Sequence, residues 1–173
     1  MTTALAAARD LLERKPVTGR VQVQGLLYYA QAWSLVWRGR PLFPEDIEAR
    51  AAGPVIASVW SASWIDLLSR PPAEDAGSPE RAGARSPDSA DSAPADSVPA
   101  GASPGRELGP EECEVIDRVH ARYGPLSDAE LSALIRSEAP WRNAHLDPAA
   151  GGIIRPDALA RFYAAAAPAS DPR

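Results

Sequence analysis

The sequence predicts a mainly α protein: a single compact domain of about six helices that carries a long disordered insertion. Three observations lead to this fold class. Apolar residues recur at spacings of three and four, Pro and Gly separate these windows, and residues 71–109 have almost no apolar bulk. Large side chains concentrate between Val21 and Trp60, a stretch with three of the five tryptophans and two of the four tyrosines. We therefore expect this stretch to form the centre of the core.

Capping residues set the starts of the expected helices. Thr2 or Thr3 can cap the first one. Pro54 is typical of a helix start, because proline is tolerated at the first helical position. Ser127 and Glu130 have the spacing of a capping box. From these starts, the apolar spacing and the flanking Pro and Gly residues, we expect six helices at about residues 3–15, 19–38, 54–70, 110–123, 127–139 and 156–166.

The second helix is the most apolar of the six. Val23, Leu26 and Trp33 share one face, and further apolar residues spread to the flanks, so we expect neighbours on more than one side. Gly39 supplies the helix stop. Gly25 in its interior should cost up to about 1 kcal/mol relative to alanine. Either the fold absorbs that cost, or another backbone approaches closely there.

Proline also marks the segments that we expect not to be helical. Residues 40–53 are expected to be irregular because Pro41 and Pro44 break regular structure. Pro140 should interrupt the chain, with Trp141 packing inward. The pair at residues 153–154 is expected to form a short extended piece.

The composition predicts one domain divided by an insertion. The first part of the domain covers residues 1–70 and the second covers 110–166. Between them, residues 71–109 are rich in Pro, Ala, Ser and Asp and cannot bury enough surface to offset the entropy of ordering. The second part has only about 60 residues, a size at which a core is marginally stable alone, so both parts should share a core. Residues 167–173 should form a frayed tail.

Charge and cysteine content exclude several classes of protein. The net charge is −5, and residues 71–105 hold six acidic and two basic residues, which leaves about −1 for the rest. Nothing resembles the basic surface of a nucleic-acid binder. No stretch approaches the length of a membrane span. The single cysteine permits neither an internal disulfide nor a cysteine-based metal site, and we expect no cofactor.

The search for catalytic chemistry is mostly negative. His120 and His145 are far apart in sequence, and a structural or solvent role is favoured over an acid–base role for each. Cys113 has acidic neighbours that should raise the pKa of its thiol, which argues against a reactive thiolate. We therefore expect no enzyme activity. An enzyme that uses His120 or His145 stays as the least favoured hypothesis.

The tryptophans at helical spacing admit two interpretations. A core role is favoured for all of them. Alternatively, one or two lie on an exposed patch for a partner, because tryptophan is enriched at binding hot spots. The residues concerned are Trp33, Trp37, Trp60 and Trp64.

Several motifs in a fixed order resemble a known family. LLYYAQAWSLVWRGRPLF (26–43) is followed by IEA (47–49) and GPV (53–55), and later by RYGPLSDAELSALIRSEAPWRNA (122–144) and IIRPDALARFY (153–163). This series resembles the Panacea domain, the SocA-like antitoxin family also known as phage-associated proteins. The chain departs from the family pattern at three positions. Gly25 stands in place of a usual lysine, Arg50 in place of a frequent tryptophan, and Ala52 in place of an aromatic residue or histidine.

The resemblance implies a mainly helical, cytoplasmic bacterial protein that neutralises a toxin by binding it, with the toxin encoded by a neighbouring gene. It also implies that some relatives are adaptors that deliver a toxin to a chaperone–protease. An adaptor or a phage-related regulator without a toxin partner is therefore the alternative.

The residues that we single out for partner binding match polar and aromatic positions of the family. An internal role competes with this interpretation: Tyr28 and Trp141 would then belong to the core, and Glu48 and Glu138 would be caps or ion-pair partners. The full set is Tyr28, Gln31, Arg40, Glu48, Glu138 and Trp141.

Overall fold

The computed structural model describes residues 2–14, 19–63, 67, 108–147 and 151–166. The expected insertion lies outside this part of the chain except for residues 108–109, and the expected tail at 167–173 lies entirely outside it. The boundaries of the domain and of its insertion therefore stay predictions.

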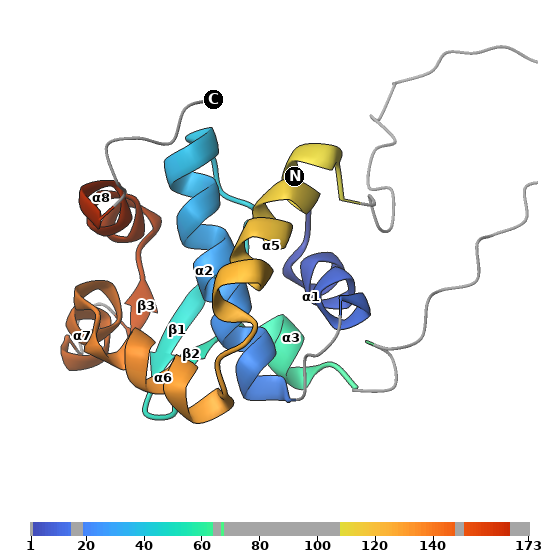
Figure 1. Cartoon of the computed structure of the whole chain (residues 1–173). Coiled ribbons are helices and arrows are strands. Elements are labelled where there is room, and N and C mark those ends of the chain that lie inside the picture. The colour runs from blue at the N-terminus through green and yellow to red at the C-terminus, as the bar shows by residue number, and fades with distance from the viewer. Residues whose placement is uncertain (1, 15–18, 64–66, 68–107, 148–150, 167–173) are drawn as a thin grey trace, which may run out of the picture.

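Helix α2 (Arg20–Arg38) runs through the centre of the described residues, with α1, α5, α6 and α8 around it (Figure 1). The mainly helical fold class is confirmed, and a small sheet accompanies the helices. The remaining elements are α1 (Ala4–Glu13), β1 (Ile47–Arg50), β2 (Gly53–Val55), α3 (Ala57–Ser61), α5 (Pro110–Tyr123), α6 (Asp128–Ser137), α7 (Ala139–Leu146), β3 (Ile153–Ile154) and α8 (Pro156–Ala166).

The central position of α2 follows from its composition. Every residue from Gln22 to Ser34 is buried, as expected for a helix that is apolar on more than one side. The helix ends where predicted, because Gly39 adopts the left-handed conformation with φ of 65°. The helices that pack on α2 come from both sides of residues 68–107 in the sequence, because α1 precedes this segment and α5, α6 and α8 follow it.

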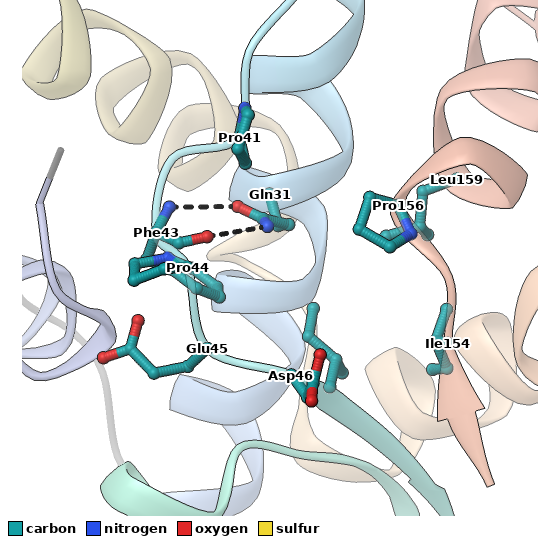
Figure 2. A pocket seen from close by; sticks show the side chains of 10 residues that line it. Gln31, Pro41, Phe43, Pro44, Glu45, Asp46, Ile154, Pro156 and Leu159 are labelled. Carbon is teal, nitrogen blue, oxygen red and sulfur yellow. Dashed lines mark hydrogen bonds between the residues drawn. The ribbon is translucent and has the colours of Figure 1, made fainter. Parts of the chain in front are cut away.

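Three buried glutamines of α2 hold the surrounding turns. The Gln31 side chain accepts hydrogen bonds from the backbone N–H groups of Leu42 (2.8 Å) and Phe43 (3.2 Å) and donates to the carbonyl of Phe43 (3.0 Å) (Figure 2). Gln24 makes the same kind of bond with the N–H of Ile56 (2.7 Å). Gln22 donates to the carbonyls of the turn between α5 and α6, at 3.0 and 2.9 Å. Buried amides are thus paired with backbone groups that helices and strands leave free.

The prediction of irregular structure for residues 40–53 is wrong in its second half. Strand β1 lies in the middle of a three-stranded antiparallel sheet, with β2 on one side and β3 on the other. Pro54 does not start a helix but lies in β2, opposite Ala49, and α3 begins only at Ala57. β2 is an edge strand, where a residue without an N–H can be accommodated. The predicted extended pair at residues 153–154 is confirmed as β3.

Helix α7 was not expected from the sequence. Pro140 does not interrupt the chain, because it occupies the first turn of α7, where its missing N–H removes no helical hydrogen bond. His145 lies in the last turn of this helix. Trp141 packs inward as predicted and is 5% exposed. The expected bounds of α5, the capping box of Ser127 and Glu130, and the start of α8 are all confirmed.

Gly25 lies where α6 packs against α2. A Cβ atom at this position would lie 2.8 Å from Cγ of Leu131 and 3.3 Å from Cδ1 of Ile135. Both side chains are buried and cannot move aside freely. The glycine thus allows a close approach, although side chains of α6 rather than a neighbouring backbone occupy the space.

We expect Gly25→Ala to lower the free energy of unfolding by about 1–3 kcal/mol, because overpacking against Leu131 outweighs the better helix propensity of alanine. Chemical denaturation measures the change. The double variant Gly25→Ala, Leu131→Ala should be less destabilised than the sum of the two single variants, because the shorter side chain makes room. Strict additivity, or a stabilised Gly25→Ala protein, would contradict the close approach.

Candidate functional site

The residues predicted to bind a partner occupy two kinds of environment. Two of them lie nearer the surface: the side chain of Arg40 is 57% exposed and that of Glu48 is 28% exposed. Within the set, Tyr28 and Glu138 are joined by a hydrogen bond. A role in partner binding stays a prediction for all six. The buried or half-buried members are Tyr28, Gln31, Glu138 and Trp141.

Glu138 receives hydrogen bonds from three tyrosines. It lies at the junction of α6 and α7, where its backbone caps α7. Its Oε2 atom accepts from the hydroxyl groups of Tyr28 (2.9 Å) and Tyr163 (2.5 Å), and its Oε1 atom accepts from that of Tyr29 (2.9 Å). One carboxylate therefore links the α6–α7 junction to α2 and α8. These contacts agree with the competing interpretation, in which Tyr28 and Glu138 have a role inside the fold.

The four tyrosines of the chain form one cluster, in which three bind this carboxylate and Tyr123 packs on Tyr29. Tyr29 stacks on Tyr123 of α5 with ring centroids 3.8 Å apart, and Tyr163 meets Tyr28 and Tyr29 edge to face. Trp33 completes the cluster by donating its indole N–H to the Tyr123 hydroxyl at 3.2 Å. Sequence reasoning singled out Tyr28 alone. Tyr123 and Tyr163 lie on other helices than Tyr28, so no local spacing in the sequence predicts that these tyrosines meet.

Burial dominates the electrostatics of this cluster. Burial raises the pKa of the Glu138 carboxyl above its ordinary value, although the three tyrosine hydroxyls act in the opposite direction. Burial also raises the pKa of each of the three tyrosines, and the neighbouring Glu138 raises it further. The tyrosines therefore stay protonated and act as hydrogen-bond donors. Such a cluster can hold helices together, whereas a buried phenol with a raised pKa releases its proton poorly and is a weak acid for catalysis.

The more exposed predicted residues form ion pairs within the chain. Arg40 contacts Glu111 at 2.5 Å, and Arg38 contacts both Glu111 and Glu112. These pairs tie the end of α2 to the start of α5, and the arginines lower the pKa of Glu111. Glu48 pairs with Arg50 two residues along the same strand, at 2.7 Å. The exposed pairs of Arg40 and Glu48 contribute little to stability and can exchange partners. The side chains of Arg38 and Glu112, by contrast, are only 10% and 16% exposed.

The histidines and the cysteine have individual surroundings. His145 stacks on Trp141, and its Nδ1 atom lies 3.0 Å from the carbonyl oxygen of Ala49. The Nε2 atom of His120 is buried without a hydrogen-bond partner. Burial and the nearby Asp10 raise the pKa of the Cys113 thiol, in the predicted direction. Within the part of the chain that the structure describes, no three His, Cys, Asp or Glu side chains are placed to hold a metal ion.

The tryptophans divide between the two interpretations. Trp33 is 6% exposed, and Trp37 stacks on it beneath the guanidinium group of Arg118. Trp60 is 45% exposed, so it does not contribute to the core as expected. Trp64 lies outside the described residues.

The fold and these contacts define a helical domain built on one buried helix, whose internal polar groups hold its own turns and junctions together. The chain belongs to the antitoxin SocA-like, Panacea domain family, because the family's sequence profile matches residues 23–142. The match includes the motifs from α2 to the start of α7, whereas the resemblance at residues 153–163 lies beyond it and stays a prediction. No curated protein and no solved structure matches the chain.

None of the helices among the described residues has the length and apolarity that crossing a bilayer requires.

We expect Glu138→Ala to lower the free energy of unfolding by about 3 kcal/mol or more, because three buried hydroxyl groups lose their acceptor at about 1–3 kcal/mol each. Urea denaturation measures the loss. Glu114→Ala is the matched control, since Glu114 forms an exposed pair with Arg118 and its loss should change stability little. Equal stability of the two variants would show that the cluster does not hold the helices together.

The pH dependence of stability should also report on Glu138. A raised pKa means that the folded state binds a proton more tightly than the unfolded state does. The contribution of Glu138 to stability should therefore fall as pH rises from about 4.3, the ordinary glutamate pKa, through the raised value. The unfolding free energy of the wild type minus that of Glu138→Gln should decline over this range. A difference that rises with pH would mean that the tyrosine hydrogen bonds outweigh burial.

Proposed function

We propose that this chain is an antitoxin: it binds a protein toxin directly and neutralises it without catalysis. Membership of the antitoxin SocA-like family over residues 23–142 is the observation that carries this proposal. The toxin is the product of a neighbouring gene, and the two proteins meet in the cytoplasm of a bacterium. No nucleic acid and no cofactor takes part.

The contacts of the described residues support a binding role. Hydrogen bonds within the fold already occupy Gln31 and the tyrosines of the Glu138 cluster, so a partner must be recognised through the outer surface. That surface offers the exposed Trp60 and the exchangeable ion pairs of Arg40 and Glu48. Tryptophan and arginine are the side chains that most often dominate binding energy at protein interfaces.

The same contacts support a role without catalysis. His145 is engaged by stacking on Trp141 and by the carbonyl of Ala49, and neither contact is with an acid or a nucleophile. Cys113 is kept protonated by the raised pKa of its thiol.

Growth rescue tests the proposal. Each gene that flanks this one is expressed alone and then together with the full chain. We expect one neighbour to arrest growth, co-expression to restore it, and the two proteins to co-purify as a stable complex. The double variant His120→Ala, His145→Ala should rescue equally well, provided that its melting temperature is unchanged.

Several results would contradict the proposal. If no neighbour is toxic, or if a toxic neighbour is rescued without forming a complex, direct neutralisation fails. Binding of the chain to a chaperone–protease in the absence of any toxin would instead support the adaptor role. Loss of rescue in a folded double-histidine variant would point to catalysis.

A further inference from the structure

A groove lies between the turn that follows α2 and the junction of β3 with α8 (Figure 2). Pro41, Pro44 and Ile47 line one wall, Ile154, Pro156 and Leu159 line the other, and Gln31 of α2 also borders it. Its volume is about 80 Å³. The walls come from segments more than one hundred residues apart, so only the folded protein contains this site.

The lining combines an apolar floor with negative charge. Most of the lining residues are apolar, the charged ones are Glu45 and Asp46, and no basic residue among those that the structure describes lines the groove. The Glu45 carboxylate lies on the α1 side of the turn, where it accepts a hydrogen bond from the N–H of Ala4. Asp46 is exposed, and none of the ion pairs found among the described residues involves it. The carboxylate of Asp46, beside an apolar groove, is therefore available to pair with a cation from another molecule.

The groove is held in its open shape. Gln31 fixes the backbone of residues 42–43 through three hydrogen bonds, and Phe43 is fully buried. Proline rings restrict the backbone at Pro41, Pro44 and Pro156. A ligand would not have to order this wall before it binds, which lowers the cost of association.

Size and charge restrict what can occupy the groove. A cavity of roughly 150 Å³ holds a benzene molecule, so about 80 Å³ suits a single aliphatic chain. Lysine and arginine carry such a chain and keep the charged head group at the rim. Residues 71–105 of the same chain are a poorer match, because they carry six acidic against two basic residues beside the negative Asp46.

We propose that this groove receives a lysine or arginine side chain of the protein partner, with the aliphatic stem between the two walls and the cationic head paired with Asp46. This inference rests on the proposed function for the identity of the partner as the toxin. It adds the place of contact and the chemistry that is recognised there.

A small-molecule titration tests the groove without the toxin. The full chain, with labelled isoleucine and leucine methyl groups, is titrated with N-acetyl-arginine amide and N-acetyl-lysine amide and followed by NMR. We expect the methyl signals of Ile47, Ile154 and Leu159 to shift, while Ile116 in α5 does not. N-acetyl-norleucine amide, which has the stem but no charge, should bind at least about fivefold more weakly, and Asp46→Asn should weaken arginine binding about as much.

The outcomes of the titration decide the inference. Groove methyls that do not shift, equal binding of the uncharged analogue, or unchanged binding to Asp46→Asn would each overturn it. The inference would also be overturned if the wild-type protein is a dimer and Asp46→Arg converts it to monomers. The groove would then be occupied by a second copy of the chain.

A second arm concerns the toxin itself. Asp46→Arg should weaken the complex with the toxic neighbour at least about tenfold, because like charges meet at the groove. Glu13→Arg is the matched control, since Glu13 is an exposed acidic residue at the end of α1, and it should leave the affinity unchanged. An Asp46→Arg variant with wild-type affinity would remove the groove from the toxin interface. If no neighbour is toxic, the proposed function fails, but the titration still decides whether the groove binds a basic side chain.

Discussion

The rest of the structure depends on the burial of α2 from Gln22 to Ser34. A buried helix pairs its own backbone N–H and C=O groups. Its buried polar side chains are out of reach of water, so they need hydrogen-bond partners within the protein. Among these side chains are Gln22, Gln24 and Gln31, and each one bonds to the backbone of a different turn. The turns around the helix are therefore positioned by α2 itself, including the turn that forms one wall of the groove.

The tyrosine cluster meets the same requirement for Tyr28 and Tyr29, which also lie on α2. Tyr28 and Glu138 are 110 residues apart in sequence, yet the hydroxyl of one donates to the carboxylate of the other. Tyr163 of α8 joins the same carboxylate, so α2, α8 and the α6–α7 junction share one acceptor. Because the internal polar groups are used in this way, contacts with another molecule are left to exposed positions such as Asp46 and Arg40.

Local signals in the sequence predicted local structure well. The apolar periodicity of α2 and the capping box at Ser127 set helix positions that the structure confirms. The sheet was missed because its strands have only two to four residues, and their pairing joins segments far apart in the chain. Pro54 was misread for a related reason: proline suits both a helix start and an edge strand, and only the pairing with β1 distinguishes them. The convergence of the tyrosines on Glu138 is likewise a tertiary feature.

Hydrogen exchange of individual amides tests the central role of α2 most directly. The N–H groups of Leu42, Phe43 and Ile56 donate to glutamine side chains of α2. If these bonds hold the turns to the helix, the three amides should exchange only when α2 itself opens, with the same opening free energy as the amides of α2. Much faster exchange at the three amides than within α2 would mean that the turns open on their own, and would contradict the organising role of the buried helix.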